Sequence, residues 1–249
     1  MIITSKSNPH IKEIAALKDK KSRRESGNYM VEGFKMVKEA MSLNKDIVCL
    51  VGTEAGLSQI DATGYDSVTV SEPVMAYVSD EKTPQGVIAV LRYDDTCHTP
   101  SGGINVLLDG ISDPGNMGTI IRSCAAAGVE NVYLADCCDP YSPKAVRSSM
   151  SGIFRTRVSE VKREDIPVIF KDIPLIVADM RGENMYGFTV KKPCCLVVGN
   201  EANGVSDFVK DSAACTVSIP MKNGVESLNA GVALSVLLYR LNKDDLETI

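Results

Sequence analysis

The sequence predicts an α/β protein with two parts, a C-terminal parallel-sheet domain preceded by a smaller α/β domain. Short, continuous apolar runs such as residues 104–108 alternate with helix-like segments, a pattern typical of parallel strands covered on both faces. Residues 93–103 combine proline, glycine and acidic side chains, as linkers do. The chain has 249 residues, 44% of them hydrophobic and 24% charged, which suits one large or two modest globular domains.

The N-terminal part is predicted to contain three helices and three strands. Asn8 and Pro9 provide a cap and a first helical residue. Residues 31–41 and 72–78 are predicted as the other two helices. Strands are expected at residues 47–51, 68–70 and 87–91, and the turn 83–86 leads into the last of them. The alternation of strands and helices indicates a small α/β domain.

The C-terminal part is predicted to contain five strands and three main helices. The strands are expected at residues 104–108, 131–134, 175–178, 195–198 and 217–219. The helices are expected at residues 116–127, closed by Gly128, at 142–150 and at 227–241. We therefore divide the chain into residues 1–94, a linker at 95–103, and residues 104–249.

The charge of the chain is polarised toward its N-terminus. The net charge is −5, but residues 1–40 hold nine Lys or Arg against five Asp or Glu, so the first 40 residues carry +4 and the other 209 carry −9. A basic run within this segment consists of Lys18, Lys20, Lys21, Arg23 and Arg24. On charge alone, a solvated basic helix explains this run as well as an RNA-binding face does.

Composition also bears on location and on metals. No apolar stretch approaches the ~18–20 residues that a membrane helix needs, and the first residues do not resemble a secretion signal, so we expect a cytoplasmic protein without membrane contact. The eight cysteines form no C-x-x-C pair, and the chain has two histidines. We expect buried, reduced thiols and no metal site.

Three glycine-rich segments follow predicted strands, at residues 109–118, 199–206 and 219–229. In α/β sheets, ligands bind outside the carboxyl ends of the strands, where all three segments fall. The first segment lacks the G-x-G-x-x-G spacing of dinucleotide sites and is not a P-loop. Each segment also has a purely structural explanation. The first two could be turns, and in the third Ser227 could be a helix cap followed by small residues that allow dense packing. The residues alone therefore predict a polar ligand without naming it.

Taken together and in order, the three segments resemble the three motifs of the SpoU (TrmH-like) family of RNA 2′-O-ribose methyltransferases, within the SPOUT superfamily. The matching motifs are NMGTIIRSCAAAGV, LVVGNEANGVS and IPMKNGVESLNAGVALSVLLY, and the resemblance spans residues 104–242. The preceding residues resemble the family's L30e-like RNA-binding domain, which the phrase TPQG at residues 83–86 usually closes. The resemblance implies a SPOUT domain with a trefoil knot, and a homodimer whose active site lies at the dimer interface.

The resemblance also implies roles for individual residues. The implied catalytic residues are Asn116, Arg122, Glu201, Ser227 and Asn229. The implied S-adenosylmethionine site consists of Val198, Gly199, Asn200, Ile219, Met221, Ser227 and Leu228. The basic run Lys18, Lys20, Lys21, Arg23 and Arg24 would bind RNA. One departure is visible, because Ala230 and Gly231 stand where the family commonly has a small polar residue and valine.

The implied reaction is methylation of a ribose 2′-hydroxyl in RNA, with ribosomal RNA, and a large-subunit guanosine, as the expected target. Transfer RNA is the alternative substrate. A non-catalytic RNA-binding module and a nicotinamide-dependent oxidoreductase are alternatives from other classes. The missing dinucleotide fingerprint argues against the oxidoreductase. Arg122 could act as a base or, because guanidinium normally stays protonated, as an electrostatic stabiliser.

Overall fold

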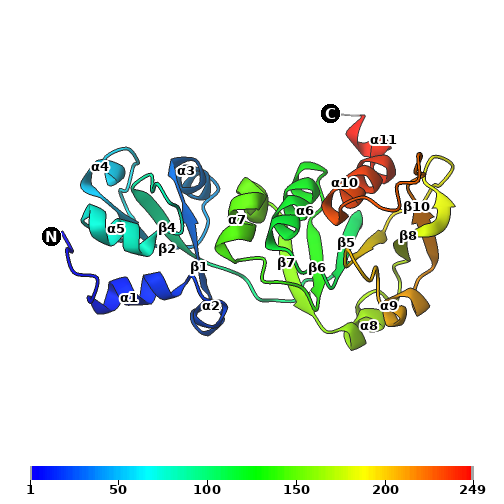
Figure 1. Cartoon of the computed structure of the whole chain (residues 1–249), viewed down its shortest axis with the longest axis horizontal. Helices are drawn as coiled ribbons and strands as arrows, with labels where there is room; N and C mark the ends of the chain where they lie inside the picture. Colours follow the sequence, from blue (N-terminus) through cyan, green and yellow to red (C-terminus); the bar gives the residue numbers. More distant parts are fainter. Residues whose placement is uncertain (1, 248–249) are drawn as a thin grey trace.

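The computed structural model describes residues 2–247, which form two separate β-sheets (Figure 1). The first has four strands in the order β1-β4-β2-β3, with β4 antiparallel to β1 and β2, and β3 parallel to β2. Its strands are β1 Asn28–Glu32, β2 Ile47–Gly52, β3 Ser67–Thr69 and β4 Val87–Arg92. Its helices are α1 Pro9–Ala16, α2 Lys20–Ser26, α3 Phe34–Ser42, α4 Glu54–Leu57 and α5 Glu72–Val78. We call this part the N-terminal domain.

The helix predicted over residues 31–41 is wrong at its start. Residues 28–32 form strand β1, which pairs with β4 along its whole length, and Gly33 separates this strand from α3. Gly33 has a φ of +91°. A side chain is strained at that angle, and an added Cβ would lie 3.0 Å from Oε1 of Gln85. Pairing with a strand from the far end of the domain therefore decides the conformation of these residues.

The second sheet has six strands in the order β10-β8-β9-β5-β6-β7, and every neighbouring pair is parallel. The predicted parallel-sheet class is confirmed. The strands are β5 Ile104–Asp109, β6 Asn131–Ala135, β7 Arg157–Val161, β8 Leu175–Asn184, β9 Cys194–Gly199 and β10 Cys215–Ser218. The helices are α6 Pro114–Ala126, α7 Pro143–Ser149, α8 Ile166–Ile169, α9 Asp207–Asp211, α10 Ala230–Leu241 and α11 Lys243–Leu246, with 3₁₀ turns η1 Met150–Phe154 and η2 Arg163–Asp165. We call this part the C-terminal domain.

Strand β7 and helices α8 and α9 were not predicted. The sequence of β7, RVSEV, has three polar and two apolar residues because this strand is the edge of the sheet, whereas the central strands β5 and β9 are buried throughout. Helices α8 and α9 have four and five residues, too few for a helical period to be visible.

The hydrophobic core joins the two domains on one side. A single cluster contains Tyr29, Val37 and Leu91 of the N-terminal domain together with Ile120, Ile153 and Leu234 of the C-terminal domain. Helices α3, α6, α7 and α10 contribute to this cluster and lie along one side of the molecule (Figure 1). Helices α1 and α5 pack in a second cluster, and α8 and α9 pack in a third. The two domains therefore share part of their core.

The segment between the sheets is held against the C-terminal domain. The backbone N–H of His98 donates to Oγ of Ser159 at 3.2 Å, and the hydroxyl of Tyr133 donates to the carbonyl of His98 at 2.9 Å. The side-chain amide of Asn131 donates to the carbonyl of Thr99 at 3.3 Å. These bonds fix a segment whose composition alone is that of a free linker.

The eight cysteines are free thiols, and four of them are buried. Cys49, Cys124, Cys194 and Cys195 are buried, whereas Cys97 is exposed, contrary to the expectation for all eight. Burial raises the pKa of the Cys49 thiol to about 11. Among residues 2–247, no group of three or more His, Cys, Asp or Glu side chains is arranged to hold a metal ion, and no helix is long and apolar enough to cross a membrane.

Candidate active site

Three of the predicted catalytic residues meet through hydrogen bonds where the glycine-rich loops converge. The side-chain amide of Asn116, in the first turn of α6, donates to Oε1 of Glu201 at 2.5 Å. The side-chain amide of Asn229 donates to Oδ1 of Asn116 at 2.9 Å. The three residues are up to 113 positions apart in sequence. The structure thus joins one residue from each motif in a single polar chain.

The first motif is held by a capped helix start. Asp113 is the N-cap of α6, and its Oδ1 accepts the backbone N–H of Asn116 at 2.9 Å. The other oxygen of Asp113 forms an ion pair with Lys144 at 2.8 Å. The hydrogen bond from Lys144 is the main reason that the pKa of Asp113 is lowered, so this carboxylate stays charged at the positive end of the helix dipole. The cap fixes the position from which Asn116 reaches Glu201.

The third motif begins its helix later than the sequence suggests. Asn229 is the N-cap of α10, and its Oδ1 accepts the backbone N–H groups of Gly231 and Val232. The alternative that Ser227 caps this helix is wrong, because Ser227 lies outside it in an exposed loop. An added Cβ at Gly231 would lie 3.3 Å from Thr119 of α6, so this small residue lets α10 approach α6 closely. Gly231, which departs from the residue that the family commonly has here, therefore fits the close packing of α10 on α6.

The second motif is a tight loop that the side chain of Asn200 organises. Its Nδ2 donates to the carbonyl of Gly110 at 2.9 Å, and its Oδ1 accepts the backbone N–H groups of Ala202 and Asn203. An added Cβ at Gly199 would lie 2.2 Å from backbone atoms of Gly204 and Val205, so only glycine fits there. Because both ends of the Asn200 amide are engaged within the protein, its side chain shapes the loop, and its backbone is what remains for a cofactor.

Two residues that support this loop were missed by sequence reasoning. Asp109 is buried at the end of β5, and its Oδ2 accepts the backbone N–H of Ser206 at 2.7 Å. Its Oδ1 pairs with Arg163 at 2.7 Å. The hydrogen bond that Arg163 donates to Asp109 is the main cause of the raised pKa of Arg163. Asp109 begins the first glycine-rich segment, but its partner Arg163 is 54 residues away and has no local signal.

The remaining predicted cofactor residues lie on β9 and on the loop between β10 and α10. Val198 and Gly199 are the buried last residues of β9. Ile219, Met221 and Leu228 are half-buried, whereas most of their neighbours in residues 219–229 are exposed. Within this loop, the backbone N–H of Val225 donates to the carbonyl of Lys222, and this is the one backbone–backbone hydrogen bond seen there among the described residues. Most of the loop's backbone donors and acceptors are therefore open to a ligand.

Arg122 lies on the exposed face of α6, six residues beyond Asn116 and therefore about 9 Å further along the helix axis. Its backbone packs on Gly152, where an added Cβ would lie 2.9 Å from the Arg122 Cα. No hydrogen bond or ion pair to another residue of the 2–247 range engages its guanidinium. Within one chain, Arg122 is thus separated from the Asn116–Glu201–Asn229 chain, and no hydrogen bond joins the Ser227 side chain to these three residues.

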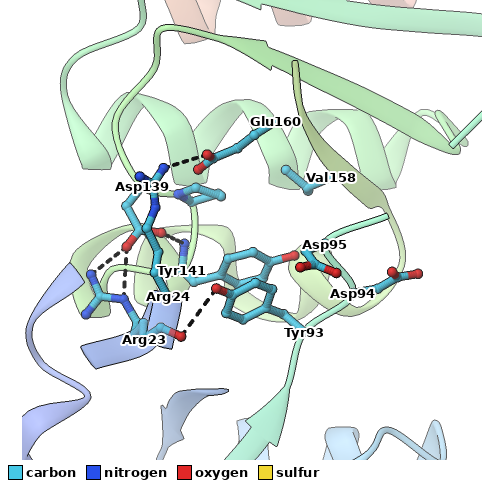
Figure 2. Close-up of a pocket in the computed structure, with 10 residues that line it drawn as sticks. Arg23, Arg24, Tyr93, Asp94, Asp95, Asp139, Tyr141, Val158 and Glu160 are labelled. Carbon is cyan, nitrogen blue, oxygen red and sulfur yellow. Dashed lines mark hydrogen bonds and ion pairs between the residues drawn. The ribbon is translucent and has the colours of Figure 1, made fainter. Parts of the chain in front are cut away.

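The residues of the basic run differ in exposure, and the expectation that Arg23 binds RNA is wrong because Arg23 is buried. Arg23 is 3% exposed and forms an ion pair with Asp139 of the C-terminal domain at 2.6 Å (Figure 2). Its third guanidinium nitrogen donates to the carbonyls of Leu17 and Lys18. A side chain that is buried and donates four hydrogen bonds to protein oxygens holds the two domains together and is closed to a phosphate.

The rest of the basic run has mixed surroundings. Arg24 pairs with Glu160 at 2.6 Å, again across the domain boundary. Lys18 donates to the carbonyl of Tyr77 at 2.8 Å, whereas Lys20 and Lys21 are exposed. A cavity of about 250 Å³ beside α2 is lined by four acidic residues and by the stacked rings of Tyr93 and Tyr141 (Figure 2). The acidic residues are Asp94, Asp95, Asp139 and Glu160.

Both parts of the chain match known families. Residues 103–239 match the SpoU rRNA Methylase family, and residues 8–89 match the MRM3-like substrate binding domain. The chain is 30% identical to the 23S rRNA (guanosine(2553)-2′-O)-methyltransferase RlmP of Bacillus subtilis, over 96% of this chain and 98% of that protein.

Solved structures agree with this match. The AdoMet-bound rRNA methyltransferase from Sinorhizobium meliloti superposes with a TM-score of 0.89 at 29% identity, covering 99% of this chain and 98% of that one. The SpoU methyltransferase AviRb from Streptomyces viridochromogenes, in complex with AdoMet, gives a TM-score of 0.87 at 25% identity, covering 96% and 98%. Agreement in sequence motifs, in both domains and in the fold shows that the chain belongs to the SpoU family of RNA methylases.

Proposed function

We propose that this protein transfers a methyl group from S-adenosylmethionine to a ribose 2′-hydroxyl of ribosomal RNA. The observation that carries the proposal is the hydrogen-bonded chain of Asn116, Glu201 and Asn229, because it brings together the three motifs that define the family. The relative from B. subtilis, similar over nearly the whole chain, is named for this reaction on a guanosine of 23S rRNA. A large-subunit guanosine is accordingly our proposed target, and transfer RNA is the alternative.

The loops suit S-adenosylmethionine, which supplies a methyl group on a positively charged sulfur when bound. Gly199 lets two backbone segments approach closely, and a side chain there would fill the turn. The backbone groups of residues 219–229 are open to the polar edges of an adenine and a ribose. Ile219, Met221 and Leu228 offer half-buried apolar surface beside them. We propose that these residues, with Val198, Ser227 and the backbone of Asn200, hold the cofactor.

The reaction would form a bond between the ribose 2′-oxygen and the methyl carbon and break the bond between that carbon and sulfur. S-adenosylhomocysteine would be the leaving group, and the hydroxyl proton would pass to solvent water. Holding the two atoms in line can supply ~7–11 kcal/mol in favourable cases. Asn116 is fixed at both ends, which leaves one oxygen of Glu201 and one amide hydrogen of Asn116 for a ribose hydroxyl. Arg122, protonated, would hold the neighbouring phosphate and stabilise charge that develops on the 2′-oxygen.

The test is methyl transfer by the purified full-length protein. Unmodified 23S rRNA and unmodified transfer RNA are each incubated with methyl-labelled S-adenosylmethionine. We expect label in the 23S rRNA at one nucleotide, where the 2′-O-methyl group blocks alkaline cleavage. Label in transfer RNA alone would change the substrate. Binding of S-adenosylmethionine without transfer to either RNA would instead support a non-catalytic module.

We further propose that two copies of the chain pair through α10 and the adjoining face of α6. Val232 and Tyr239 are 46% and 47% exposed, and Val236 lies between them at helical spacing. An exposed apolar row on a helix indicates a contact surface. Arg122 and Ala126 are exposed on the neighbouring α6, so a partner here would lie beside Arg122.

Val236→Glu is expected to convert the dimer to a monomer, because it would place a charge in the centre of this row. Sedimentation velocity measures the change. The matched control Lys243→Glu, in an exposed residue just beyond α10, should remain dimeric. A wild-type protein that sediments as a monomer, or a dimer that Val236→Glu leaves intact, would contradict the proposed face.

We also propose the domain bounds, the knot and the location that the sequence and its family resemblance imply. The domain bounds 1–94, 95–103 and 104–249, the trefoil knot of the C-terminal domain and a cytoplasmic location are expected for a member of this family that acts on ribosomal RNA.

A further inference from the structure

The RNA needs a route from the N-terminal domain to Arg122, and both arginines of α2 are already paired with carboxylates. Arg23 and Arg24 are engaged with Asp139 and Glu160, and two further carboxylates, those of Asp94 and Asp95, line the adjoining cavity (Figure 2). A phosphate backbone would be repelled there. Helix α2 also lies with α1 along the opposite edge of the molecule from α3 and α6 (Figure 1). Lys20 and Lys21 are exposed on α2, where Lys21 lies 3.8 Å from Glu25.

A second group of basic residues lies on the same side as Arg122. Residues 35, 38, 39 and 42 share one face of α3, since they fall within an arc of about 100°. On this face Lys35 and Lys38 are exposed, and Glu39 forms an ion pair with Arg155 of the C-terminal domain. The pair shows that this face of α3 borders the C-terminal domain.

The same contacts continue to the catalytic helix. Arg155 follows η1, and its backbone N–H donates to the carbonyl of Gly152 at 3.0 Å. Gly152 packs directly on the backbone of Arg122. Lys45, just beyond the end of α3, lies close enough to Arg155 for the like charge to lower the lysine's pKa, although burial lowers it more. Lys35, Lys38, Lys45 and Arg155 therefore form a basic strip that crosses the domain boundary and ends beside Arg122.

We propose that this basic strip is the surface over which the RNA passes from the N-terminal domain to the catalytic loops. The inference rests on the proposed RNA methyltransferase function and specifies its substrate-binding surface. Within the strip Glu39 pairs with Arg155, which leaves three of the four positive charges on a protein whose total charge is −5. Lys35 also lines a cavity with Glu32, Asp80 and Glu81, and Arg147 pairs with the last two. The shared hydrophobic core fixes α3 relative to α6, so the charges keep a constant position with respect to Arg122.

The test compares RNA binding by three double variants of the full-length protein. Lys35→Ala/Lys38→Ala removes two charges from the strip, Lys20→Ala/Lys21→Ala removes two from α2, and Lys171→Ala/Lys191→Ala is the matched control in exposed lysines elsewhere. The probe is unmodified 23S rRNA, measured by filter binding between 50 and 300 mM salt. Binding of S-adenosylhomocysteine, which uses other residues, reports that each variant is folded.

We expect the strip variant to bind RNA roughly 10- to 30-fold more weakly near 0.1 M salt. The slope of log affinity against log salt should fall by about 1.4, since each contact to a single strand contributes roughly 0.7. Lys35→Arg/Lys38→Arg should retain binding because it retains the charges. An unchanged affinity and slope in the strip variant, or a larger loss in the α2 variant, would overturn the proposed route.

The outcome separates this inference from the function on which it rests. If the wild type methylates 23S rRNA and the strip variant binds it normally, only the strip is wrong. If the wild type neither binds nor methylates RNA, the proposed function fails and the strip fails with it.

Discussion

Replacing Arg122 with alanine is expected to lower the rate of methyl transfer roughly 10²- to 10³-fold, the range found when one group that stabilises developing charge is removed. Arg122 is exposed, and its guanidinium has no partner among residues 2–247, so its removal leaves no buried group unsatisfied. The free energy of unfolding should therefore change by less than about 0.5 kcal/mol. Single-turnover transfer to 23S rRNA, with saturating S-adenosylmethionine, measures the loss.

Two comparisons define the role of Arg122. Arg157→Ala removes another exposed arginine of the same domain and should leave the rate within about twofold of the wild type. Arg122→Lys keeps the charge but loses the planar fork of donors, so we expect an intermediate rate. The affinity for S-adenosylhomocysteine should be the same in all three variants. Normal transfer by Arg122→Ala would remove Arg122 from the mechanism.

Replacing Arg23 with alanine is expected to destabilise the protein by roughly 3–5 kcal/mol, the usual cost of removing one partner from a buried ion pair. Asp139 is 12% exposed and would keep its charge without the guanidinium that now neutralises it. The carbonyls of Leu17 and Lys18 would lose their donor as well. Urea unfolding followed by circular dichroism measures the change, and the loss should appear as a lower midpoint.

Arg24→Ala is the matched control for Arg23. Arg24 also pairs across the domain boundary, but its side chain and that of Glu160 are both about half exposed. Exposed ion pairs contribute less than about 1 kcal/mol, so this variant should stay close to the wild type. Arg23→Met/Asp139→Leu removes both charges and should recover part of the stability lost in Arg23→Ala. Equal effects of Arg23→Ala and Arg24→Ala would contradict the structural role of Arg23.

The sequence by itself determined the class of the C-terminal domain and the place of its site. The runs at residues 104–108 and 195–198 are apolar throughout because both strands lie at the centre of a parallel sheet and are covered on both faces. A strand of this kind is visible in its own residues. The three glycine-rich segments follow β5, β9 and β10 and meet at the same edge because the strands run in the same direction, so a site for a polar ligand could be placed there. The resemblance to the SpoU family then selected Asn116, Glu201 and Asn229, which the structure joins by hydrogen bonds.

Only the tertiary structure decided the features that depend on residues far away in the sequence, such as strand pairing and burial. Strand β1 exists because β4 pairs with it. Asn229, which caps α10 in place of Ser227, also donates to Asn116, 113 residues away. Arg23 has the same local sequence pattern as its exposed neighbours Lys20 and Lys21, but Asp139, 116 residues away, makes it a buried link between domains. Local sequence records periodicity and turn chemistry, whereas burial and pairing depend on which distant residues pack nearby, and no short segment contains that information.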